Sequence, residues 1–236
     1  MAKEIYKSYA RMNYNASIYC EMAMEAYYNL KKTVENMEDE LEEYLKNGIY
    51  INKCAISTVV FSAMCLEAFF NDYLAVYLGD EDYYQGFDSL NPISKLKLIC
   101  EFLFDIEMDK NSLYYTYTKQ LFKYRNEYVH SKSTEMPDSL GAASLEELEE
   151  PENEDVNHSI LVSEKHNYNL TINLAEDSLK AIKEIAVLFD SHDSNVYAVQ
   201  KLFGTGMRFG MDDEREYEHH KYALELLNLK RKKYEV

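Results

Sequence analysis

The N-terminal part of the chain carries a long apolar stripe that neither glycine nor proline interrupts. Between residues 4 and 46 both residue types are absent, and apolar residues recur at spacings that alternate between four and three. This pattern is typical of a helix that packs along its length. It predicts one long helix, or two nearly collinear helices, within residues 1–48, ending at Asn47-Gly48 with the glycine just past the helix. The stripe consists of Ile5, Tyr9, Met12, Ala16, Tyr19, Ala23, Ala26, Leu30, Val34, Met37, Leu41 and Tyr44.

The rest of the chain is also poor in turn residues, with 7 glycines and 3 prolines in 236 residues. This scarcity and the abundance of helix-forming residues predict an all-α fold, a helical bundle joined by short loops. We divide it into the long N-terminal helix, a core over residues 49–133, an acidic loop insert over 134–158 and a C-terminal part over 159–236. Helices are expected over 51–78, from Pro92, from Asn111, over 174–190, over 196–203 and over 212–233, with a loop over 80–90 and a small β-hairpin over 160–172.

The cysteines and the hydropathy pattern bear on the compartment. Cys20, Cys54, Cys65 and Cys100 form no C-x-x-C pair, so buried thiols are expected rather than a disulfide scaffold or zinc site. The N-terminus does not resemble a signal peptide. The most apolar stretch, residues 54–66, is shorter than the roughly 18 residues that a membrane span needs. We therefore expect a cytoplasmic protein that is not in a membrane.

The charge of the chain is strongly negative and uneven. A net charge of −17 argues against nucleic-acid binding when it is considered alone. Residues 135–155 hold nine carboxylates and no lysine or arginine, whereas residues 119–132 are locally basic. The acidic segment is either a solvated insert or a shield that repels polyanions and pairs with Lys119, Lys123 and Lys132.

Two patterns invite a ligand-binding interpretation that we do not favour. The glycine-rich run over residues 204–210 follows a helix rather than a strand and lacks the lysine of a phosphate-binding loop. His219 and His220 are adjacent, and adjacent side chains on a helix diverge, so a solvated face is expected there rather than a metal site.

The remaining candidate is Arg125 followed five residues later by His130. Spacing alone is weak evidence, because Arg215 and His220 repeat it among carboxylates. A structural role near a helix end is the competing interpretation. Residues five apart on a helix also point about 140° away from each other. The two could converge if the helix ends before His130, or if two protomers line one cleft.

Residues 59–133 resemble the HEPN superfamily, and are especially similar to uncharacterised bacterial HEPN proteins. The resemblance rests on three stretches: Val60 to Tyr73 (VFSAMCLEAFFNDY), Leu90 to Lys95 (LNPISK) and Arg125 to Lys132 (RNEYVHSK). HEPN active sites place an arginine, usually followed by a polar residue, before a histidine after four to six intervening positions. Arg125, Asn126 and His130 fit that pattern, and Glu67 and Asn71 fit the frequent Glu-x-x-x-polar pair on the neighbouring helix. The resemblance covers about a third of the chain.

The resemblance implies metal-independent cleavage of RNA at a site shared by two protomers. Imidazole can act as both acid and base near neutral pH, and a guanidinium can stabilise charge on phosphorane oxygens. His130 would move protons, Arg125 would stabilise charge and Asn126 would position, with Glu67 and Asn71 supporting. Lys123 and Lys132 would bind RNA. No cofactor or metal is expected, and DNA is not an expected substrate.

The sequence is therefore compatible with two alternative functions. The first is a homodimeric endoribonuclease, whose setting as a toxin or antiphage effector with an antitoxin or defence-system partner is implied by family analogy alone. The second is a non-catalytic HEPN module used for dimerisation or protein interaction, which the acidic charge and the long stripe favour. The stripe exceeds what a compact four-helix bundle can cover, so it predicts a homodimer in both cases.

Overall fold

The computed structural model describes residues 15–37, 41–129, 154–193, 196–203 and 218–229, and for residues 41, 44, 45, 80, 81, 84, 154–170 and 200 the backbone alone. These residues form helices, with no strand among them, as the composition predicts. The helices are α1 (Asn15–Glu35), α2 (Leu41–Leu78), α3 (Asp80–Gly86), α4 (Pro92–Leu98), the π-helical turn η1 (Ile99–Leu103), α5 (Leu113–Val129), α6 (Glu154–His192), α7 (Ala198–Phe203) and α8 (Glu218–Leu226).

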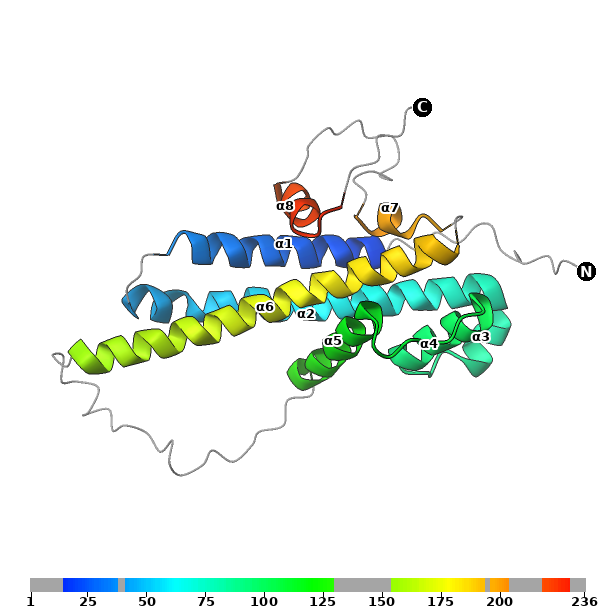
Figure 1. Cartoon of the computed structure of the whole chain (residues 1–236), viewed down its shortest axis with the longest axis horizontal. Helices are drawn as coiled ribbons and strands as arrows, with labels where there is room; N and C mark the ends of the chain where they lie inside the picture. Colours follow the sequence, from blue (N-terminus) through cyan, green and yellow to red (C-terminus); the bar gives the residue numbers. More distant parts are fainter. Residues whose placement is uncertain (1–14, 38–40, 130–153, 194–195, 204–217, 230–236) are drawn as a thin grey trace, which may run out of the picture.

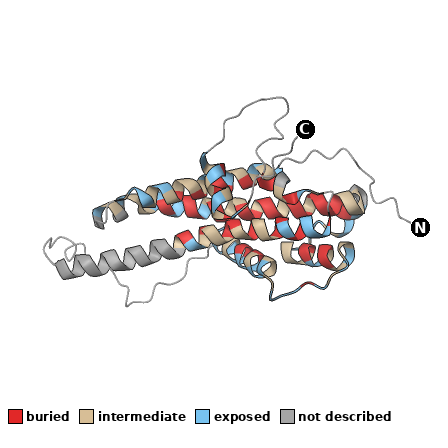
Figure 2. Cartoon of the chain, turned by 45° about the horizontal axis from the view of Figure 1, so that its top comes forward, coloured by how far each residue is buried: buried red, intermediate tan, exposed pale blue. Residues whose placement is uncertain are grey.

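Three long helices, α1, α2 and α6, lie side by side and form the body of the molecule (Figure 1). α5 packs against α6 and α2, α3 and α4 lie against α2, and α7 and α8 lie against α1 (Figure 1). Buried residues follow the inner faces of the long helices (Figure 2). Here rings from three elements pack together, with Phe189 of α6 4.8 Å from both Phe69 and Tyr73 of α2 between ring centroids, and 5.1 Å from Phe104.

Over the described residues, the N-terminal stripe forms neither one continuous helix nor two collinear helices, so that prediction is wrong. α1 ends at Glu35, and α2 runs back along it (Figure 1). Folding back lets the two apolar faces cover each other, which removes more apolar surface from water than a single extended helix could. Gly48 lies inside α2 instead of following a helix end. An internal glycine costs only about 1 kcal/mol relative to alanine, which packing of the helix can outweigh.

The reversal also removes the argument that the stripe needs a partner chain. Its members Ala16, Ala23 and Leu30 are fully buried within the chain itself. α8 completes the cover, with Tyr222 lying 6.2 Å from Tyr27 and 5.8 Å from Tyr28 between ring centroids. Over the described part of the stripe, the expectation of an uncovered face is therefore wrong.

The predicted hairpin over residues 160–172 is also wrong, because α6 is helical from Glu154 to His192. The C-terminal half of α6, including the predicted helix over 174–190, is packed in the core and provides a formed helix. Adding a residue to a formed helix costs little, whereas an isolated two-stranded hairpin is marginal at best. The weak alternation of apolar and polar residues over 160–172, on which the hairpin prediction rested, therefore did not determine the local structure.

The elements that hold the candidate site follow local signals in the sequence. Gly79 ends α2 with φ 83°, a value that favours glycine, and leads directly into α3, which replaces the expected loop over residues 80–90. α4 begins as predicted, because the Asn91 side chain accepts a hydrogen bond from the Ser94 backbone N–H at 2.9 Å and Pro92 occupies the first helical position. The four cysteines are buried, as expected.

By length and composition alone, residues 46–78 of α2 could cross a membrane. The apolar stretch is therefore longer than the predicted residues 54–66. In the structure 56% of its most apolar window is buried inside the bundle. Packing against α1, α5 and α6 therefore covers part of this apolar surface.

Candidate functional site

Arg125 and Glu67 form an ion pair that joins α5 to α2. The Arg125 Nη2 donates to Glu67 Oε2 at 2.7 Å, and its Nη1 donates to Asn126 Oδ1 at 3.0 Å. The two charged side chains are 24% and 34% exposed, so the pair lies at the edge of the core and is open to solvent on one side. The structure thus brings together Arg125, Asn126 and Glu67, which the sequence placed in one site.

Asn71 lies one turn after Glu67 on α2 and connects this helix to α3 and α4. Its Oδ1 accepts hydrogen bonds from the Tyr83 hydroxyl at 2.7 Å and from Lys95 Nζ at 2.8 Å. Glu67 and Asn71 therefore share a helix face but have different partners. Glu67 holds α5, and Asn71 holds the α3–α4 segment.

Lys95 is a member of this polar group that the sequence analysis did not select. The residue is only 2% exposed, and its ammonium donates to Asn71 Oδ1 and to the Asp88 carbonyl oxygen, both at 2.8 Å. It also lies 5.7 Å from the Tyr83 ring centroid. Burial lowers the pKa of Lys95, and attraction to Asp88 and then Glu67 opposes that shift.

A signal for Lys95 is present in the sequence. The residue stands four positions before Ile99, on the same helix face as the buried Leu96, Ile99 and Cys100. A lysine on an apolar helix face requires a partner inside the protein, because an unpaired buried charge is costly. Asn71, already selected from the sequence, is that partner.

The structure describes only some of the remaining residues that the sequence predicted for the site. Lys123 is exposed on α5 and forms an i,i+4 ion pair with Glu127, with Nζ 3.8 Å from Oε1. His130 and Lys132 lie outside the described residues, as do the acidic segment through residue 153, the glycine-rich run over 204–210 and Arg215. α5 is helical through Val129, so His130 is the next residue in the chain.

The arrangement around Arg125 is suited to holding an anion. A guanidinium has five N–H donors, and among the described residues the bonds to Glu67 and Asn126 engage two of them. Glu67 fixes the plane of the guanidinium, which then presents its other donors in a set direction. Carboxylate and phosphate oxygens are the acceptors that match the geometry of such donors.

Comparison of the chain with protein-family models, with curated proteins and with solved structures finds no match.

Proposed function

We propose that the protein is a metal-independent endoribonuclease that acts as a homodimer, with Arg125, Asn126 and His130 in its active site. The observation that carries the proposal is the Arg125–Glu67 pair, which holds a partly exposed guanidinium near the end of α5, five residues before His130. The resemblance of residues 59–133 to the HEPN superfamily supplies the reaction class.

The reaction needs a base, an acid and a stabiliser of negative charge. A base removes the proton from the 2′-hydroxyl, and the resulting oxyanion attacks the adjacent phosphorus. The bond to the 5′-oxygen then breaks, and an acid protonates the leaving oxygen. His130 from each of two protomers would perform the two proton transfers, while Arg125 neutralises charge on the phosphorane oxygens. Glu67 and Asn126 would position the guanidinium, and Asn71 and Lys95 would hold α2 against α3 and α4.

Local charge supports contact with RNA despite the net charge of −17. Lys119 and Lys123 are exposed on α5, the helix that carries Arg125. Contacts between these lysines and a phosphate would act over distances shorter than the Debye length of about 8 Å, where salt screens less, and Lys123 would exchange its pairing with Glu127 for a phosphate.

The direct test is cleavage of labelled single-stranded RNA by the full chain. Wild type should cut, and Arg125→Ala and His130→Ala should each lower the rate by at least about a hundredfold. Lys46→Ala is a matched control, since Lys46 pairs with Glu43 on α2 some 30 Å from Glu67 along the helix axis. His192→Ala is the histidine control, and both controls should cut like wild type. DNA of the same sequence should stay intact, because it lacks the 2′-hydroxyl.

A second candidate is a non-catalytic module for dimerisation or protein interaction. The engagement of Arg125 by Glu67 and the acidic charge favour it, because a structural ion pair would look the same. In that case wild type would cut no RNA, while the variants at Arg125 and Glu67 would still lower stability.

Both candidates rest on a homodimer, which light scattering of the full chain at micromolar concentration can test. A dimeric mass is expected, and a monomeric mass would exclude the shared site. We also propose a cytoplasmic location and, in a cell, a partner that restrains the activity.

A further inference from the structure

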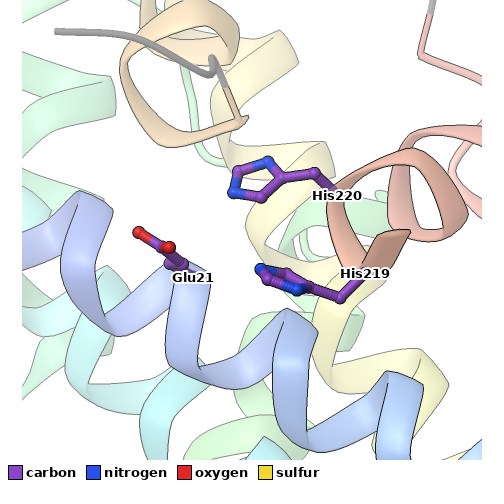
Figure 3. A group of neighbouring side chains, drawn as sticks. All are labelled: Glu21, His219 and His220. Carbon is purple, nitrogen blue, oxygen red and sulfur yellow. The ribbon is translucent and has the colours of Figure 1, made fainter. Parts of the chain in front are cut away.

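A second group of functional side chains lies at the junction of α1 and α8, at the opposite edge of the bundle from α5 (Figure 1). Glu21 of α1 and His219 and His220 of α8 each offer one donor atom, and these three atoms lie within 4.8 Å of one another. Figure 3 shows the two imidazoles pointing from α8 toward α1, on which Glu21 stands. The two rings are 5.0 Å apart between centroids and tilted by 45°.

The expected solvated face is wrong for His220, which is only 5% exposed. α8 packs across α1, and His220 shares its buried face with Ala223 and Leu227, three and seven positions further along. Adjacent residues on a helix diverge by about 100° at Cβ, but long side chains can turn back toward a common point. The packing of α8 on α1 brings both rings to one side of the helix.

Two imidazole nitrogens and one carboxylate oxygen form a donor set for a divalent transition metal of the Zn²⁺ class. Bond lengths of about 2.0–2.2 Å require three donors around one ion to lie roughly 3.6 Å apart or closer. The observed limit of 4.8 Å exceeds that value by about 1.2 Å, a distance that side-chain rotations can cover. Mg²⁺ and Ca²⁺ prefer sets made of oxygens, so they fit this group poorly.

The charge around the group is compatible with a cation. The N-terminus of α8 contributes a partial positive charge, which opposes the binding of a cation. Two carboxylates offset it, Glu21 in the group and Glu218 at the start of α8, where the Tyr28 hydroxyl donates to Glu218 Oε2. Glu21 and Glu218 therefore favour a cation at the junction, and Lys221 next to His220 opposes one.

We propose that Glu21, His219 and His220 bind one Zn²⁺-class ion that fastens α8 to α1. The link joins residues about two hundred positions apart in the chain and would stabilise the C-terminal helix on the bundle. This site is independent of Arg125 and of the proposed ribonuclease activity.

The test is a calorimetric titration of the metal-stripped full chain with Zn²⁺, together with melting curves with and without the ion. Wild type should bind one Zn²⁺ per chain and melt at a higher temperature when it is bound. Glu21→Gln and His219→Gln each remove one of the three donors and should weaken binding by at least about tenfold, which reduces the shift in melting temperature. Mg²⁺ at the same concentration should leave the melting curve unchanged.

His192→Gln, a histidine on α6 outside the group, is the matched control and should bind like wild type. Glu21 and His219 are only partly buried, so their variants are expected to fold, and circular dichroism checks this. His220→Gln is measured in the same way and tests the third donor. The proposal is overturned if Zn²⁺ does not bind, or if folded Glu21→Gln and His219→Gln variants bind it as wild type does. RNA cleavage is not part of the readout, so failure here leaves the ribonuclease test unaffected.

Discussion

Arg125 Nη2 on α5 lies 2.7 Å from Glu67 Oε2 on α2, across 58 residues of sequence. α2 is the central helix of the bundle, so this contact ties the helix that carries the proposed arginine to the core of the fold.

A double-mutant cycle on this pair should give a coupling of about 1 kcal/mol in the free energy of unfolding, because the bond is short and charge-assisted but partly open to solvent. The variants are Glu67→Ala, Arg125→Ala and the double variant, measured by denaturant unfolding. The matched control pair is Lys97–Glu101, 3.7 Å apart on a helix surface, which should couple by only about 0.3–0.5 kcal/mol. Additive effects at Arg125 and Glu67 would contradict the structural role assigned to the pair.

RNA cleavage should persist in EDTA and leave 2′,3′-cyclic phosphate ends, because the proposed acid, base and charge stabiliser are all side chains. The ends can be identified by mass spectrometry of the cleaved strands. Removal of an ion from the α1–α8 junction could lower stability and imitate a catalytic requirement. The same assay is therefore run on Glu21→Gln, below its melting temperature. Strict dependence of both proteins on Mg²⁺ would refute the mechanism.

Tyr83→Phe should destabilise the fold by about 1 kcal/mol, because it removes the hydroxyl that donates to Asn71 Oδ1 at 2.7 Å while preserving the buried ring. Lys95 keeps its own bond to Asn71, so the loss should not exceed that of a single hydrogen bond. Tyr197→Phe, at an exposed position, is the control and should leave the unfolding midpoint unchanged. Equal midpoints for Tyr83→Phe and wild type would show that the Asn71 link contributes little.

Stability should fall as pH rises above about 9, because several buried groups hold their protons more tightly in the folded state. Burial raises the pKa of Cys100 to about 11, helped by the charge of Glu101. Burial, followed by hydrogen bonding to Tyr77 and the charge of Asp193, raises the pKa of Tyr73, and burial next to Glu176 raises that of Tyr27.

The direction in which stability changes with pH follows from the number of protons bound in the folded and unfolded states. A group whose pKa is raised on folding stabilises the protein below its unfolded pKa, and that contribution is lost at higher pH. Lys95 works in the opposite direction, because burial lowers its pKa and the cost of its charge disappears as pH rises. Burial raises the pKa of more groups than it lowers, so the denaturant midpoint should drop between about pH 9 and pH 11. The drop should be smaller in Tyr73→Phe, and an unchanged midpoint in wild type would contradict the prediction.

Local sequence determined the features that depend on neighbours within a few residues. The scarcity of glycine and proline predicted an all-α fold, and Asn91-Pro92 marked the start of α4 correctly. The absence of a C-x-x-C pair predicted buried thiols, and the four cysteines are buried. The adjacency of Arg125 and Asn126 and the four-residue spacing of Glu67 and Asn71 also needed no tertiary information, because helical periodicity alone places each pair on neighbouring positions or on one face.

Only the tertiary structure decided the features that depend on which helix faces which. An apolar stripe shows that a helix needs a partner but not which partner, and so α1 packs on α2 of the same chain where the sequence suggested a second copy. Residues 160–172, in which apolar and polar residues alternate weakly, are helical because they continue α6, whose C-terminal half packs in the core. The burial of Lys95 on Asn71 and the meeting of Glu21 with His219 and His220 join residues far apart in the chain. Such contacts form only because packing of the apolar faces brings distant helices together, and this packing reflects the burial of the whole core and not the local sequence.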